Sequence, residues 1–147
     1  MKCLRNKSIL LIDDDVSLLR ALDKVLSGAG AMVTTACRGG DGIELVSKRE
    51  KRFDLIITDL QMPFVKGVGV VRVIHDFFPP QLVVVLTAFA TPEIRAACLE
   101  HGAVAVLEKP MGSQGLIAAL EAALRAGATT RERNPEFPKT STEQAAH

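Results

Sequence analysis

Ile9-Leu10-Leu11-Ile12-Asp13-Asp14-Asp15 joins a run of four apolar residues to three consecutive aspartates. A short, continuously apolar run is typical of a strand that is covered on both faces of a parallel sheet. The aspartates then stand at the carboxyl end of that strand, where open α/β sheets bind ligands. The run is too short for the apolar core of a secretory signal peptide, which has about 7–15 residues. We interpret this stretch as the first strand of an α/β domain with a polar site at its end.

Four similar apolar segments follow along the chain, and amphipathic patterns with a helical period lie between them. Strands that alternate with helices predict a parallel sheet with helices on both faces. Five such units fit an α/β, flavodoxin-like doubly wound (βα)5 fold, a five-stranded parallel sheet in the order 2-1-3-4-5. The predicted strands cover residues 8–12, 31–36, 54–58, 82–86 and 103–107, and the predicted helices cover residues 16–27, 40–51, 67–77, 91–100 and 113–126.

The length of 147 residues favours one domain with a hydrophobic core, which we assign to residues 1–127. Gly127 is expected to end the last helix, because glycine is common just past a helix C-terminus. Residues 128–147 are polar and include Pro135 and Pro138, so we predict a disordered tail or linker there.

The composition excludes several classes of protein. The net charge of +1 gives no electrostatic reason to expect contact with nucleic acid or an anionic membrane. The longest apolar stretch, residues 82–90, is far shorter than the roughly 18 residues of a membrane span. The three cysteines are widely spaced and odd in number, which favours a reducing compartment. We therefore expect a cytoplasmic protein without a membrane anchor.

Polar side chains stand at the carboxyl ends of four predicted strands. Asp13 and Asp14 follow the first strand, and Asp59 follows the third. Thr87 and Lys109 follow the fourth and fifth strands. These ends should meet where the strand order reverses, between the first and third strands. A single aspartate at such a place is more often a helix cap, but here four strands each supply a group of a needed chemical type.

This set of side chains points to phosphoryl transfer. Three neighbouring carboxylates repel one another unless a cation compensates them. Oxygen-only ligands suit Mg²⁺, which binds through one or two carboxylates and phosphate oxygens. A carboxylate nucleophile with a metal, a hydroxyl and a lysine has the parts needed to form an aspartyl phosphate.

With these residues the sequence resembles the receiver domain of bacterial two-component response regulators, of the kind that includes chemotaxis regulators. The matching motifs lie at residues 9–15, 54–63, 84–88, 102–103 and 109–110, within a match from about Lys7 to Ala126. The resemblance implies that Asp59 is the phosphoacceptor and that the donor is a phosphohistidine on a sensor histidine kinase or a phosphotransfer protein. It also implies a signalling switch that assists its own phosphorylation and dephosphorylation, rather than an enzyme.

The resemblance further assigns the metal ligands and the phosphoryl contacts. Asp14 would bind Mg²⁺ directly, Asp13 mainly through water, and the backbone carbonyl of Gln61 would complete the protein ligands beside Asp59. Thr87 would donate a hydrogen bond to a phosphoryl oxygen. Lys109 would pair with the phosphoryl group, and its bond to Pro110 would be cis. Phosphorylation would then move the surface formed by the fourth helix, fifth strand and fifth helix.

Three residues depart from the usual pattern of this family. Val106 stands three positions before the lysine, where an aromatic switch residue is usual, so an aromatic that moves inward with Thr87 is not available. Phe89 stands two positions after Thr87, where small or polar residues are common; we hypothesise that it shields the phosphoryl group from hydrolysis. Lys66 replaces a common aspartate before a glycine, and we assign it no role.

Several alternatives remain open from the sequence. Asp13-Asp14-Asp15 also resembles the nucleophile motif of haloacid-dehalogenase-type phosphatases, although no acidic motif follows Lys109 at a strand end. A dinucleotide site is disfavoured, because no Gly-x-Gly-x-x-Gly follows the first strand. A binding module that has lost phosphorylation is a third reading.

Two expectations concern the output of the switch. Met1 lies just before the first strand, so we expect a stand-alone receiver or the N-terminal receiver of a longer regulator. The exposed side of the last predicted helix is rich in alanine, which would allow a weak homodimer through the fourth helix, fifth strand and fifth helix.

Overall fold

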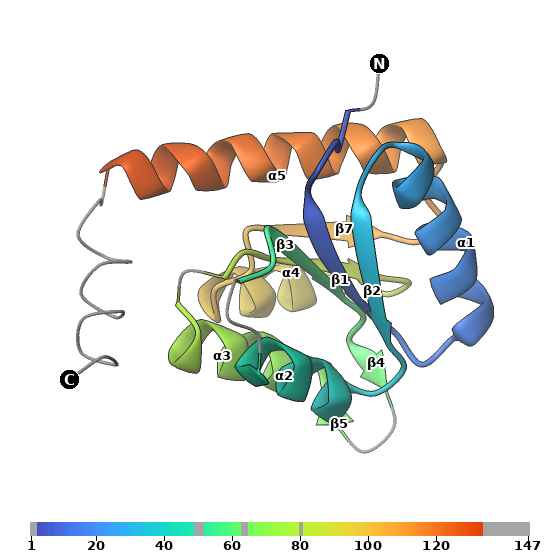
Figure 1. The fold of residues 1–147 in the computed structure, drawn as a ribbon. Helices are drawn as coiled ribbons and strands as arrows, with labels where there is room; N and C mark the ends of the chain where they lie inside the picture. The colour runs from blue at the N-terminus through green and yellow to red at the C-terminus, as the bar shows by residue number, and fades with distance from the viewer. Residues whose placement is uncertain (1–2, 49–51, 63–64, 80, 134–147) are drawn as a thin grey trace.

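The fold is built around one parallel sheet in the computed structural model, which describes residues 3–48, 52–62, 65–79 and 81–133. The five strands lie in the order β2-β1-β3-β6-β7, which confirms the predicted order 2-1-3-4-5 of a flavodoxin-like fold (Figure 1). They are β1 (Ser8–Ile12), β2 (Met32–Ala36), β3 (Leu55–Thr58), β6 (Val83–Thr87) and β7 (Ala105–Glu108).

Helices cover both faces of this sheet (Figure 1). One face is covered by α1 (Val16–Gly28) and α5 (Ser113–Arg133), and the other by α2 (Gly39–Lys48), α3 (Gly67–Phe77) and α4 (Pro92–Glu100). Each layer of helices completes a separate hydrophobic core against the strands. None of these helices, within the described part of the chain, is long and apolar enough to cross a membrane.

Strand β1 contributes to both cores, which explains its continuous apolar sequence. Ile9 and Leu11 pack in the core beneath α1 and α5, whereas Leu10 and Ile12 pack in the core beneath α2, α3 and α4. All four side chains are at most 1% exposed. Because alternate side chains of a strand point to opposite faces, a strand buried on both sides needs apolar residues at every position. This burial fixes the carboxyl end of β1, and Asp13 with it.

Side chains cap two of the helices that begin beside this end of the sheet. The Asp15 carboxylate accepts a hydrogen bond from the Leu18 N–H at 3.1 Å, which makes Asp15 the N-cap of α1. The Thr91 hydroxyl accepts one from the Ile94 N–H at 3.2 Å, and Pro92 occupies the first turn of α4. Both caps satisfy N–H groups that the helix leaves unpaired.

Helix α5 is longer than predicted. It continues to Arg133, so the predicted end at Gly127 is wrong, and residues 128–133, which were assigned to the tail or linker, belong to this helix. Gly127 instead allows a close approach to the side chain of Leu82, because a Cβ atom at this position would collide with that side chain. The glycine lets α5 pass close to the sheet without ending the helix. The rest of the predicted tail, residues 134–147, lies outside the described residues.

A short antiparallel pair follows β3 and was not predicted. It consists of β4 (Gln61–Met62) and β5 (Val65–Lys66), with Gln61 opposite Lys66. Two-residue strands carry no periodic signal, so the sequence indicated only a loop here. Residues 49–51, at the end of the predicted second helix, also lie outside the described residues.

Candidate functional site

Backbone hydrogen bonds hold the predicted site residues at the carboxyl edge of the sheet. The Asp13 N–H donates to the Ala36 carbonyl at 3.1 Å, and the Asp59 N–H donates to the Ile12 carbonyl at 3.0 Å. The Lys109 N–H donates to the Thr87 carbonyl at 2.8 Å. Each bond extends the pairing of parallel strands by about one residue, so the site residues are positioned by the sheet itself and not by free loops.

Three carboxylates meet at this edge, as the sequence predicted. Asp13, Asp14 and Asp59 each place a carboxylate oxygen within 4.8 Å of the other two. Asp13 is 4% exposed and Asp59 is 7% exposed, whereas Asp14 is exposed. Two buried carboxylates and one open to solvent form a cluster of hard oxygen ligands that is accessible from one side.

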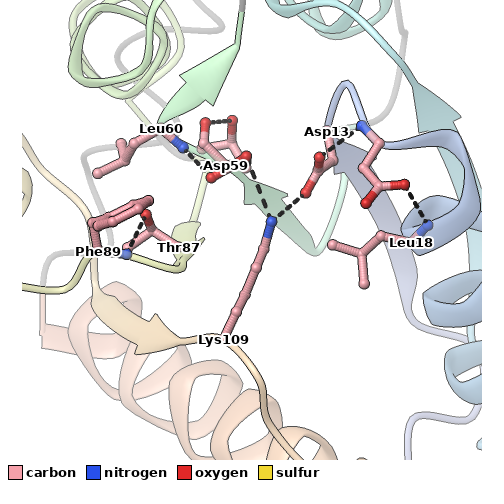
Figure 2. Close-up of polar contacts among 9 residues, drawn as sticks. Asp13, Leu18, Asp59, Leu60, Thr87, Phe89 and Lys109 are labelled. Atoms are coloured by element: carbon pink, nitrogen blue, oxygen red, sulfur yellow. Dashed lines mark hydrogen bonds and ion pairs between the residues drawn. The ribbon is translucent and has the colours of Figure 1, made fainter.

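The ammonium group of Lys109 lies between two of these carboxylates. Its Nζ is 2.7 Å from Asp13 Oδ2 and 3.5 Å from Asp59 Oδ2 (Figure 2). The three side chains are 20%, 6% and 8% exposed, so water screens these pairs only weakly. Lys109 therefore compensates part of the negative charge, and the three carboxylates still outnumber the single ammonium.

Local hydrogen bonds fix the orientation of the two buried carboxylates. Asp13 Oδ1 accepts from the Asp15 N–H at 2.9 Å, and Asp59 Oδ1 accepts from the Leu60 N–H at 2.7 Å. In each case the other oxygen, Oδ2, is the one that faces Lys109. The donors are backbone N–H groups, which every residue type except proline supplies, so the sequence held no specific signal for them.

Thr87 lies at the end of β6, and its side chain is fully buried. Its hydroxyl oxygen accepts a hydrogen bond from the Phe89 N–H at 3.3 Å, so the start of the β6–α4 loop is tied to it (Figure 2). The Phe89 side chain is 53% exposed, an unusual environment for a large aromatic group. Thr87 is thus connected directly to the loop that leads into α4.

Two further predictions concern residues beside the cluster. The peptide bond between Lys109 and Pro110 is cis, as predicted. Gln61 begins β4, two residues after Asp59. The role of its carbonyl as a metal ligand stays a prediction.

One polar side chain near the site was missed by sequence reasoning. Arg95 of α4 donates hydrogen bonds to the backbone carbonyls of Ala90 and Val106, at 3.2 and 2.8 Å. Its partners are backbone carbonyls, which every residue type carries, so no sequence motif predicts these contacts. Only the folded arrangement shows that this arginine joins α4 to the loop after Thr87.

The geometry has a clear chemical consequence. A buried carboxylate with one oxygen facing an ammonium is held where it can act as a nucleophile toward an electrophilic phosphorus. The neighbouring carboxylates offer ligands for a hard cation, and the lysine offers positive charge to an incoming anion. The structure therefore brings together Asp13, Asp14, Asp59 and Lys109, with Thr87 on the adjacent strand.

Comparison with known sequences identifies the family of this chain. Residues 9–121 match the family model of the response regulator receiver domain. The transcriptional regulatory protein ZraR of Salmonella typhimurium is 37% identical over 136 residues, which are 92% of this chain and 30% of ZraR. The transcriptional regulatory protein PrrA of Mycobacterium bovis is 34% identical over 128 residues, 87% of this chain and 54% of PrrA. The chain thus spans about a third of one relative and about half of the other.

Solved structures of receiver domains share the fold of this chain. A response regulator receiver domain protein from Clostridium thermocellum superposes with a TM-score of 0.78 at 27% identity, covering 84% of this chain and 98% of that one. The chemotaxis protein CheY4 of Vibrio cholerae gives a TM-score of 0.75 at 27% identity, covering 80% and 98% of the two chains. Because the family match covers most of the chain and the fold is shared, this chain belongs to the receiver domains of bacterial two-component response regulators.

Proposed function

We propose that this receiver domain is a phosphorylation-operated switch in which Asp59 accepts the phosphoryl group. The observation that carries the proposal is the convergence of Asp13, Asp14 and Asp59 around the ammonium group of Lys109. The donor would be a phosphohistidine of a sensor histidine kinase or of a phosphotransfer protein. The main supporting argument is chemical, because such a cluster holds a nucleophile, charge compensation and metal ligands together.

The residues present fit a divalent metal ion. Three carboxylate oxygens within 4.8 Å of one another, with one carboxylate open to solvent, are a donor set of the kind that Mg²⁺ prefers. Asp13, Asp14 and Asp59 would hold the ion, together with the backbone carbonyl of Gln61. When bound, Mg²⁺ would neutralise negative charge on the carboxylates and on the phosphoryl oxygens.

The residues of this chain have distinct parts in the transfer. An Asp59 carboxylate oxygen attacks the phosphorus, the bond between phosphorus and the histidine nitrogen breaks, and its electron pair stays on the imidazole. Lys109 stabilises the charge on the phosphoryl oxygens, because its ammonium already lies 3.5 Å from Asp59 Oδ2. Thr87 donates its hydroxyl hydrogen to a phosphoryl oxygen.

The same step would change the surface of the domain. Phosphorylation replaces one carboxylate by a group of about −1.5 to −2 charge with three acceptor oxygens. Thr87 would turn toward these oxygens, and its hydroxyl already holds the start of the β6–α4 loop through the Phe89 N–H. Movement of Thr87 would therefore pass to α4, and the surface of α4, β7 and α5 would become the output face.

The experiment is phosphorylation by acetyl phosphate in the presence of MgCl₂, followed by intact-protein mass spectrometry. We expect the wild type to gain the mass of one phosphoryl group and Asp59→Asn to gain none. Asp76→Asn is a matched control, because Asp76 is an exposed aspartate on α3 that pairs only loosely with Arg72, at 3.7 Å. Equal incorporation in the wild type and Asp59→Asn would reject Asp59 as the acceptor.

We also infer that the domain is not an enzyme acting on an external phosphate ester. Assays with small phosphate esters distinguish this from a phosphatase of the haloacid-dehalogenase type. Turnover of an ester without any accumulated phosphoprotein would favour the phosphatase. Absence of both turnover and phosphoprotein would favour a binding module that has lost phosphorylation.

A further inference from the structure

The side chain of Arg95 links three segments around the start of α4. Its Nε donates to the Ala90 carbonyl at 3.2 Å, and its Nη1 donates to the Val106 carbonyl at 2.8 Å. Its Nη2 lies 3.8 Å from Glu108 Oε2. The Arg95 side chain is 43% exposed and that of Glu108 is 58% exposed, so the contact with Glu108 is the weakest of the three.

Each of these contacts lies close in sequence to a residue of the phosphorylation site. Ala90 follows Phe89, whose N–H donates to the Thr87 hydroxyl. Glu108 precedes Lys109 and is opposite Thr87 in the pairing of β6 with β7. A displacement of either Thr87 or Lys109 would therefore change the positions of the groups that Arg95 contacts.

The packing around Val106 explains why a polar link is used here. Val106 is 8% exposed and belongs to the core beneath α4, with Ala90 and Ile94 packed against the same core. Its short side chain ends within this core, so it offers no ring that swings between a buried and an exposed position. The Val106 backbone carbonyl, by contrast, is held directly by Arg95. The connection between β7 and the β6–α4 loop thus runs through a guanidinium group.

We propose that Arg95 is a positioning residue that holds the β6–α4 loop and β7 in the arrangement of the unmodified site. When Thr87 turns toward a phosphoryl group, the loop carbonyl of Ala90 moves with it, and the two hydrogen bonds of Arg95 no longer fit together. The proposal rests on the proposed phosphorylation of Asp59. Because coupling between two sites is reciprocal, loosening the contacts of Arg95 makes it easier for the site to bind a phosphoryl group.

The test is a titration with beryllofluoride, a phosphoryl mimic that binds aspartate, in the presence of MgCl₂. Loss of hydrogen bonds that stabilise only the unmodified state should tighten binding to Arg95→Gln by about fivefold. Glu108→Gln, which removes only the long and exposed contact, should change affinity by less than about twofold. Arg72→Gln is the matched control, since Arg72 is an exposed arginine that pairs with Asp76 on α3, and we expect no change for it.

The outcomes separate a positioning role from a structural one. A lower melting temperature with unchanged beryllofluoride affinity, or weaker binding by Arg95→Gln than by the wild type, would overturn the proposal. Absence of Asp59-dependent binding in the wild type would overturn the proposed function itself, and the role of Arg95 with it. If the wild type and Arg95→Gln bind beryllofluoride equally strongly, only the proposed role of Arg95 is rejected.

A second measurement needs no variant and remains decisive if Arg95→Gln fails to fold. In the wild-type protein, the Nε–H resonance of Arg95 reports its bond to the Ala90 carbonyl. We expect this resonance to shift when beryllofluoride binds, whereas that of Arg72 stays in place. An unmoved Arg95 resonance in fully bound protein would show that its contacts are the same in both states, against the proposal.

Discussion

Replacing Lys109 by methionine tests whether one ammonium group compensates the cluster of carboxylates. At an effective dielectric constant of about 20, the contacts at 2.7 Å to Asp13 and 3.5 Å to Asp59 each supply about 5–6 kcal/mol of gross Coulomb energy. Desolvation offsets much of this gain. We therefore expect Lys109→Met to lower the free energy of unfolding by about 3 kcal/mol, at the low end for breaking a buried pair.

The assay is urea unfolding with excess EDTA and again with saturating MgCl₂. We expect the loss caused by Lys109→Met to be full in EDTA and smaller with Mg²⁺, because a divalent cation supplies the missing positive charge. Lys48→Met is the control, since Lys48 pairs with Glu44 on the surface, where both side chains are more than half exposed; we expect no resolvable change. Equal stability of Lys109→Met and the wild type in EDTA would refute the charge compensation. A loss that Mg²⁺ leaves unchanged would refute the metal site.

Three further predictions concern single positions. Gly42→Ala should destabilise the protein by about 1–2 kcal/mol, because its Cβ would collide with a β1 side chain; Gly40→Ala in the same helix meets no atom within 4 Å and should not destabilise it in the same urea assay. Phe89→Ala should shorten the half-life of the phosphorylated protein if the exposed ring shields the phosphoryl group from water, and an unchanged half-life would contradict that hypothesis. Burial raises the pKa of the Cys98 thiol, so alkylation of the native protein should modify the two exposed cysteines first, and equally fast labelling of Cys98 would contradict its burial.

The sequence was sufficient to predict the sheet and the acidic cluster. Residues 9–12 are apolar at every position, and such a short run is typical of a strand that is buried on both faces. Once the strands alternate with helices, the handedness of parallel connections leaves few strand orders. The carboxyl ends of the strands then meet at one edge, so Asp13, Asp59 and Lys109 were expected to converge without any knowledge of side-chain positions.

Features that depend on tertiary contacts or on very short strands were not predictable. Gly127 was interpreted as a helix end, because the sequence does not show that Leu82 lies against it. The β4–β5 pair consists of two-residue strands, which are too short to carry a pattern. In the sequence Arg95 looks like any other arginine of a helix. Its hydrogen-bond partners are the backbone carbonyls of Ala90 and Val106, which do not depend on the residue types at those positions.

Reduction with borohydride, followed by peptide mapping, tests the phosphorylation of Asp59 most directly. An aspartyl phosphate is reduced to homoserine, which marks the modified residue permanently. After treatment with acetyl phosphate and MgCl₂, we predict homoserine in place of Asp59 within the tryptic peptide of residues 53–66, and aspartate unchanged at Asp54 in the same peptide. Homoserine at Asp13 or Asp14, or no homoserine in a protein that binds Mg²⁺, would contradict Asp59 as the phosphoacceptor.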